Sequence, residues 1–154
     1  MVADAPCDVW FYHLERTSLD QALPELLEKT LARGWRALVR STAKERVEHL
    51  DGWLWSYRDD SFLPHGVDHE PQAERQPILI TAGMDASNGA DALFLIDDAE
   101  PGDVSAYQRC VLLFDGRDEA AVAAARGRWA QFKAIGATVS YWRQGETGAW
   151  RKVA

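Results

Sequence analysis

Ala92-Leu-Phe-Leu-Ile96 is the middle one of three short apolar runs that decide the fold of this chain. Pro77-Ile-Leu-Ile-Thr81 precedes it and Cys110-Val-Leu-Leu-Phe114 follows it, and all three show little alternation between apolar and polar residues. Such runs are typical of parallel strands, because helices cover both faces of a parallel sheet. The three runs therefore predict the interior of an α/β sheet.

Helical patterns lie on either side of these strands. After Ser18 the leucines recur at helical spacing, and Ser18 with Gln21 forms a capping box that fixes the helix start. Thr42 and Glu45 form a second capping box, which predicts another helix. A long helix is expected over about 118–135, since an acid-rich turn opens it and a glycine closes it.

The order of these elements predicts one three-layer α/β sandwich with a mainly parallel sheet. Further strands are expected at 9–12, 36–39 and 138–142, the last of them as the edge of the sheet. Residues 56–76 carry no periodicity and predict an irregular connection, and 104–107 predicts a brief helix. The fold is Rossmann-like without a phosphate-binding loop.

Composition limits the classes of function. The chain suits a single domain over 1–154, and its net charge of −7 argues against direct binding of nucleic acid, which needs a basic face. No run reaches the ~20 apolar residues that span a membrane, and no signal peptide is evident. We therefore expect a cytoplasmic protein without a membrane partner. Cys7 and Cys110 lie beside apolar runs and are expected to be small buried side chains.

Sequence motifs for catalysis are weak. The turn after the first strand, His13-Leu-Glu-Arg-Thr17, has no glycine, and no phosphate-binding loop occurs elsewhere, so no nucleotide cofactor is expected. His65 and His69 have the spacing of helical metal ligands, but a neighbouring proline and glycine favour a polar loop and no metal site. Asp97-Asp98 follows a predicted strand, which leaves a small α/β hydrolase or nucleotide-handling enzyme as the alternative function.

One stripe of the long helix carries Arg126, Trp129 and Lys133, a turn after Val122. Spacing alone leaves two interpretations open. Either Trp129 is a core residue and the cations extend from the edge of its face, or the stripe is a pocket for an acidic peptide with an aromatic end. In the pocket, Arg126 would hold a carboxylate in forked geometry. Arg151 and Lys152 would add to the same positive field.

A second candidate surface surrounds Trp53 and Trp55. These residues are two apart on a predicted helix, so one faces the core when the other faces solvent. Phe62, Leu63 and Pro64 follow in the irregular segment. They either pack onto the domain or form an aromatic anchor for a partner.

The sequence of this second surface resembles that of a known protein family. Residues Leu54-Trp-Ser-Tyr-Arg-Asp-Asp-Ser-Phe-Leu-Pro-His65 resemble the Leu-Trp … Ser-Phe-x-Pro-His signature of the chi subunit of bacterial DNA polymerase III. The C-terminal half is similar in Phe114, in Ala125-Arg126-x-Arg128-Trp129-x-x-Phe132-Lys133-x-x-Gly136, and in Trp150 followed by basic residues. The resemblance covers nearly the whole chain in order and length.

The resemblance implies an adaptor in DNA replication with no catalytic site of its own. Chi subunits link the clamp loader to single-stranded-DNA-binding protein by gripping that protein's acidic, Phe-ended C-terminal tail. The positions implied here for the tail are Val122, Arg126, Trp129, Lys133, Val139, Arg151 and Lys152. The positions implied for the psi subunit, or for a helicase on the same face, are Trp55, Phe62, Leu63, Pro64 and His65.

Two positions depart from the family pattern. Val122 and Ala130 stand where chi subunits carry lysines. Both departures weaken the positive charge expected around the tail, and they leave more of the grip to Arg126.

Overall fold

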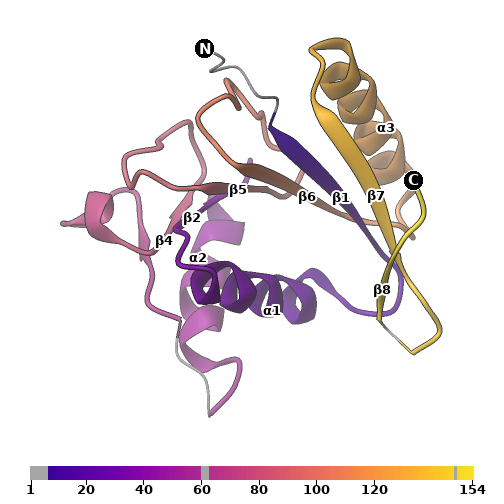
Figure 1. Cartoon of the computed structure of the whole chain (residues 1–154). Helices are drawn as coiled ribbons and strands as arrows, with labels where there is room; N and C mark the ends of the chain where they lie inside the picture. The colour runs from indigo at the N-terminus through magenta and orange to yellow at the C-terminus, as the bar shows by residue number, and fades with distance from the viewer. Residues whose placement is uncertain (1–6, 60–62, 148) are drawn as a thin grey trace.

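The computed structural model describes residues 7–59, 63–147 and 149–154. These residues form one sheet of eight strands (Figure 1), whose spatial order is β3-β4-β2-β5-β6-β1-β7-β8. The strands are β1 Asp8–Leu14, β2 Ala37–Arg40, β3 Gly66–Val67, β4 Ile78–Thr81, β5 Ala92–Leu95, β6 Arg109–Asp115, β7 Thr138–Gln144 and β8 Trp150–Lys152. All neighbours run parallel except β7 and β8. The predicted α/β fold with a mainly parallel sheet is confirmed.

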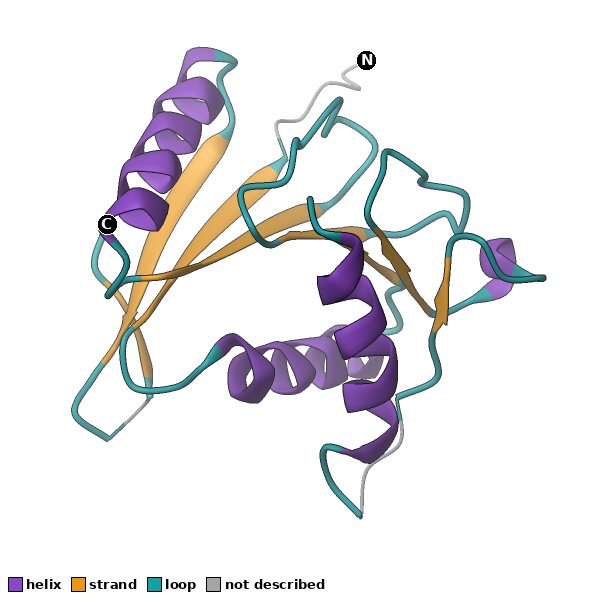
Figure 2. Cartoon of the chain, turned by 180° about the vertical axis from the view of Figure 1, so that it is seen from behind, coloured by secondary structure: helices purple, strands orange, loops and turns teal. Residues whose placement is uncertain are grey.

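Helices cover both faces of this sheet (Figure 2). α1 Leu19–Ala32 and α2 Lys44–Ser56 lie on one face, and α3 Glu119–Ala134 lies on the other. Each face has its own core: Phe94 is buried on the side of α1 and α2, and Phe11 on the side of α3. Full burial of such a side chain contributes roughly 1.5–3 kcal/mol. The predicted three layers are therefore present.

The start of α1 combines a local signal with a tertiary contact. Ser18 caps it as predicted: its hydroxyl accepts from the N–H of Gln21, whose side chain accepts from the N–H of Ser18. Pro24 lies inside the helix and has no N–H to donate to the carbonyl of Asp20, four residues earlier. The indole N–H of Trp53 donates to that carbonyl at 2.7 Å instead. A tryptophan of α2 thus compensates for the proline of α1.

The predicted cap of α2 is wrong. This helix begins after Ala43, which makes no side-chain cap bond. The hydroxyl of Thr42 donates to the carbonyl of Asp97 at 3.0 Å, and the Ala43 N–H donates to the hydroxyl of Ser41 at 3.0 Å. Thr42 does not cap because Asp97, distant in sequence, provides a tertiary acceptor.

Three further segments differ from their predicted structure or position in the sheet. Residues 56–76 contain β3 and the short 3-10 helix η2 Ala73–Arg75, where an irregular connection was expected. β7 is not the edge, because β8 pairs with it in antiparallel register. Residues 104–107 form a turn, closed by the bond from the N–H of Tyr107 to the carbonyl of Val104, and not a helix. Elements of two or three residues are too short for a periodic pattern to reveal them.

Candidate partner-binding sites

α3 presents the predicted stripe on one side. Asp118 caps the helix by accepting hydrogen bonds from backbone N–H groups of its first turn. Val122, Arg126, Trp129 and Lys133 then follow at spacings of four, three and four residues. Such spacings bring side chains onto one helix face. We call these four residues the α3 stripe.

Trp129 packs at the boundary between core and surface. Its ring centroid lies 5.2 Å from that of Phe11 and 6.0 Å from that of Tyr141, both in edge-to-face geometry. The ammonium of Lys133 lies 5.8 Å from the same centroid, within cation–π range. The ring thus joins the core while an exposed cation lies over it, as the first interpretation expects, and the pocket for an acidic peptide stays a prediction.

Arg126 and Arg128 are two residues apart on α3 and differ in their contacts. Two residues correspond to about 200° around an α-helix, so they point in nearly opposite directions. The side chain of Arg128 is only 13% exposed and donates to the carboxylate of Asp98 at 2.9 Å. Arg126 is exposed and forms no ion pair among the described residues. Its guanidinium is therefore available to a ligand.

β7 supplies the other side of this site. Val139 and Tyr141 are half-buried and pack into the same core as Trp129. The phenol of Tyr141 hydrogen-bonds to Nδ1 of His13. Burial raises the pKa of Tyr141, and the nearby charge of Arg126 lowers it in part. Sequence reasoning missed Tyr141 and His13, although strand alternation places Tyr141 on the same face as Val139.

His13 is fixed from several sides. Its Nε2 lies 3.2 Å from the carboxylate of Glu15. Burial and then the charge of Arg143 lower the pKa of His13, while the charges of Glu15 and Asp115 oppose them. A side-chain carbon on Gly116 would overlap the imidazole, so only glycine allows this close approach.

Arg151 and Lys152 of β8, which were predicted to contribute to one positive field, lie on opposite faces of the sheet. Arg151 pairs with Arg143, on the face of β7 that carries Val139 and Tyr141. Lys152 pairs with Trp142, whose ring stacks on Trp10 in the core beneath α1. Alternation therefore directs Lys152 to the face opposite α3, which corrects the expectation that it adds to the α3 stripe.

The structure decides which tryptophan of α2 faces outward. Trp53 is half-buried and bonded to α1, whereas Trp55 is 53% exposed. The ring of Trp55 lies against the imidazole of His65, with centroids 4.4 Å apart. We call the five positions predicted for the second partner, Trp55, Phe62, Leu63, Pro64 and His65, the α2 surface.

Beneath Trp55 the α2 surface is buried. Leu63 is 2% exposed and belongs to the core, and Pro64 is half-buried. His65 is also buried, with Nδ1 2.8 Å from the carbonyl of Leu63 and Nε2 2.9 Å from the carbonyl of Asp51. Phe62 lies outside the described residues. His65 therefore supports the ring of Trp55, and neither Leu63 nor His65 presents its side chain to a partner.

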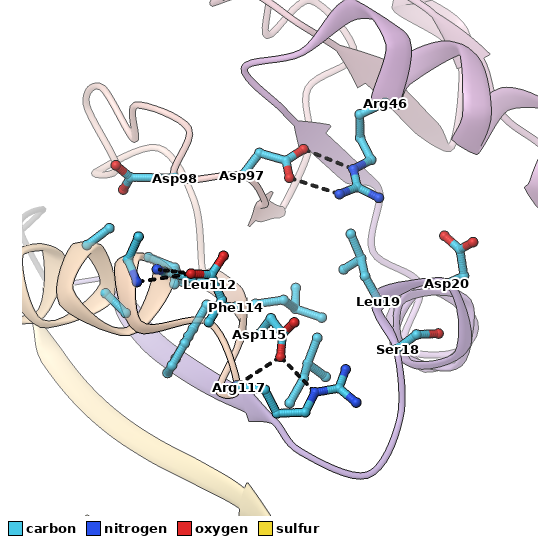
Figure 3. Close-up of a pocket in the computed structure, with 17 residues that line it drawn as sticks. Ser18, Leu19, Asp20, Arg46, Asp97, Asp98, Leu112, Phe114, Asp115 and Arg117 are labelled. Atoms are coloured by element: carbon cyan, nitrogen blue, oxygen red, sulfur yellow. Dashed lines mark hydrogen bonds and ion pairs between the residues drawn. The ribbon is translucent and has the colours of Figure 1, made fainter.

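A cavity of about 640 Å³ opens at the carboxyl ends of β1, β5 and β6 (Figure 3). Open α/β sheets bind their ligands at this edge. The lining includes Asp97 and Asp98, the alternative catalytic pair, together with Arg46, Asp115 and Arg117. In Figure 3 two dashed bonds join Arg46 to Asp97, and Arg117 lies against Asp115.

The two aspartates anchor a strained turn. Both have left-handed backbone, with φ of 55° and 56°, which costs a non-glycine residue roughly 1–3 kcal/mol. Arg46 donates to the Asp97 carboxylate at 3.0 and 3.1 Å, and Ser41 donates to it at 2.7 Å. Arg128 holds Asp98. Both carboxylates are thus engaged in bonds that hold the turn, which does not favour the enzyme alternative.

The remaining candidates for chemistry are separated or buried. His65 is buried, while the side chain of His69 is 72% exposed beside Asp68. Within the described residues no group of three or more His, Cys, Asp or Glu could hold a metal ion. Cys7 and Cys110 are buried, as predicted. Burial raises the pKa of the Cys7 thiol to about 11 and that of Cys110 well above its usual range, so neither is a ready nucleophile.

These features define the class of the protein. It is a Rossmann-like α/β domain whose exposed aromatic and cationic candidates lie on α2, α3 and β8, outside the strand-edge cavity. None of the helices in the described parts of the chain has the length and apolar character to cross a membrane.

Comparison with known proteins identifies the family. The profile of the family described as DNA polymerase III chi subunit, HolC, matches residues 7–140. The chain belongs to this family, and the resemblance seen in the sequence is confirmed. The matched region includes the α3 stripe and the α2 surface, whereas Arg151 and Lys152 lie beyond it.

Two curated relatives carry the same name. A probable DNA polymerase III subunit chi from Rickettsia prowazekii is 27% identical over 103 residues, which are 67% of this chain and 62% of the relative. The DNA polymerase III subunit chi of Pseudomonas aeruginosa is 30% identical over 89 residues, 58% of this chain and 61% of the relative. The chain therefore spans less than two thirds of the length of these relatives.

Proposed function

We propose that this chain is a non-catalytic adaptor of DNA polymerase III that links the clamp loader to single-stranded-DNA-binding protein. The α3 stripe grips the acidic C-terminal tail of that protein, and the α2 surface binds the psi subunit or a helicase. The observation that carries the proposal is the exposed guanidinium of Arg126. It forms no ion pair among the described residues and lies one turn from the half-buried ring of Trp129.

The grip combines a charged contact with an apolar one. Arg126 offers paired N–H donors that match a carboxylate in forked geometry. Trp129, Tyr141 and Val139 supply an apolar floor on which the terminal ring of the tail packs. Lys133 adds positive charge beside this floor. Arg151 extends the charge along the same face of the sheet.

The cations are exposed, so salt screens their attraction and a single tail binds weakly. Single-stranded-DNA-binding protein displays many tails along a coated strand. A high effective concentration of tails then compensates for the weak individual contact. We therefore propose that the chain tethers the clamp loader to the coated strand through weak tail contacts that release and re-form.

Calorimetric titration with the tail peptide tests the α3 stripe. We expect Arg126→Ala to weaken binding by about 1.5–3 kcal/mol, the usual scale of a hydrogen bond to a charged group. Arg117→Ala is the matched control, because Arg117 is also exposed but lies at the start of α3 beside Asp115. Unchanged affinity in Arg126→Ala, or an equal loss in both variants, would contradict the tail site.

Co-purification tests the α2 surface separately. Trp55→Ala is expected to lose psi, or the helicase, while it keeps its affinity for the tail peptide. Met84→Ala is a suitable control, because Met84 is 55% exposed and Trp55 is 53% exposed. Retention of the partner by Trp55→Ala would contradict this assignment and leave the tail site unaffected.

A further inference from the structure

A stack of cationic and aromatic side chains lies on the sheet face opposite α3. The guanidinium carbon of Arg33 is 4.3 Å from the ring centroid of Trp35. The guanidinium carbon of Arg109 is 5.2 Å from the same centroid and 3.8 Å from that of Trp10. Trp10 stacks on Trp142, with centroids 4.9 Å and planes 22° apart. We call these five residues the cation–indole stack.

Among the described residues, the two arginines of the stack have no ion-pair partner. Nε of Arg109 is also buried there without a hydrogen-bond partner. Asp8 is the register neighbour of Arg109 and its charge acts on that guanidinium, without an ion pair. Burial and then the charge of Arg33 lower the pKa of Arg109. Two like charges held over one ring, within the Debye length of ~10 Å at 0.1 M salt, repel each other.

An anion between them would relieve this repulsion. Aromatic rings occupy the planar faces of a stacked guanidinium and leave its in-plane N–H groups for an anion such as a phosphate. Arg33 is exposed, and Trp35, Trp10 and Trp142 are half-buried. Each of these tryptophan residues therefore keeps some exposed surface beside the cations. Single-stranded nucleic acid matches this combination, since it carries phosphates and unpaired bases along one chain.

We propose that the cation–indole stack is a direct contact site for single-stranded DNA, with its phosphates on Arg33 and Arg109 and its bases against the indoles. An acidic peptide would match the cations but leave the indoles without a specific partner. The chain also belongs to a family of DNA polymerase III subunits. The site goes beyond the adaptor function, in which the chain reaches the strand only through another protein.

This proposal revises the expectation from net charge. A charge of −7 opposes binding at long range, but it does not cancel two guanidiniums placed together without an ion-pair partner in the described part of the chain. Two phosphate contacts on a single strand give a slope of log affinity against log salt of about −1.4. Loss of one contact reduces that slope by about 0.7.

Fluorescence anisotropy of a labelled oligo-dT, titrated with the full chain and no other protein, tests the site. We expect salt-dependent binding at 50 mM salt, which Arg33→Glu weakens at least fivefold and with a shallower slope. Arg16→Glu is the matched control, because it changes the net charge equally. Arg16 is exposed and follows the carboxyl end of β1, whereas Arg109 begins β6 at the opposite edge. The control is expected to weaken binding less than twofold.

Three outcomes would overturn the proposal. The first is no binding of the oligonucleotide at low salt, and the second is an equal loss in both variants, which would show only the effect of bulk charge. The third is a Glu-rich peptide that binds through Arg33 more tightly than the oligonucleotide does. Tail-peptide affinity is measured in the same variants and should not change. Failure of the strand site is thereby distinguished from failure of the adaptor function.

Discussion

The α3 stripe and the α2 surface differ in how they divide charge from apolar area. On α3 the aromatic ring of Trp129 is half-buried, and the exposed groups are the cations Arg126 and Lys133. On α2 the exposed group is the ring of Trp55, and the polar group beneath it, His65, is buried. Polar groups are thus on the outside of one surface and on the inside of the other.

This difference implies two kinds of recognition. A surface with exposed cations attracts a charged segment over a distance and loses affinity as salt is added. A surface with an exposed indole on a buried support depends on contact area and changes little with salt. Under the proposed function, one small domain would therefore hold two partners that respond to different conditions. The predictions below test each half of this comparison.

The largest expected effect concerns the buried support of the α2 surface. Leu63→Ala should lower the free energy of unfolding by about 2–4 kcal/mol, because Leu63 is 2% exposed and its loss leaves a cavity. Trp55→Ala should lower it by less than about 1 kcal/mol, since that ring is largely exposed. Urea unfolding measures both. If both variants lost a similar amount of unfolding free energy, the assignment of Leu63 as a buried residue and Trp55 as an exposed contact would be contradicted.

The next effect concerns the inward tryptophan. Trp53→Phe should lower the free energy of unfolding by about 1–2 kcal/mol, because the carbonyl of Asp20 loses its donor. In a Pro24→Ala background the new backbone N–H at residue 24 can serve that carbonyl. The cost of Trp53→Phe should then be smaller. Equal costs in the two backgrounds would show that the proline and the tryptophan are independent.

His13, which orients Tyr141 behind the α3 stripe, should make stability sensitive to acid. Its pKa is lowered in the folded state, so the unfolded state takes up the proton first as the pH falls. Neutral His13 makes its full contribution to the free energy of unfolding above about 6.5, the pKa of histidine in the unfolded chain. This contribution declines as the pH falls toward the lower pKa of the folded state. Urea unfolding between pH 7.5 and 5.5 should show a weaker pH dependence in His13→Gln. The exposed His69 provides the control, and an equal change in His69→Gln would contradict the assignment.

The smallest effect restores a charge at the α3 stripe. Ala130 is exposed beside Trp129, and Ala130→Lys should strengthen tail-peptide binding by about 0.2–1 kcal/mol. The gain should disappear at high salt. Ala86→Lys, at an exposed loop position, gives the same change in net charge. A gain in both variants, or one that persists in salt, would show that the contact is not local electrostatics.

The local patterns of the sequence were sufficient for the framework of the domain. The apolar runs at 77–81, 92–96 and 110–114 correspond to the buried parallel strands β4, β5 and β6, and Ser18 capped α1 as its capping box predicted. The spacing of the α3 stripe followed from helical periodicity. Each of these features depends on residues three or four apart, or on continuous burial of one run, so a linear sequence contains the necessary information.

The tertiary structure alone decided which side chains are available. Residues that are distant in sequence meet because β1 lies between β6 and β7, which brings His13 to Tyr141. The His13 ring also lies so close to Gly116 that no larger residue fits there. Trp53 faces inward, where its indole N–H bonds to the Asp20 carbonyl that Pro24 leaves without a donor. Strand order and helix packing fix these contacts between distant residues, and no local period encodes them.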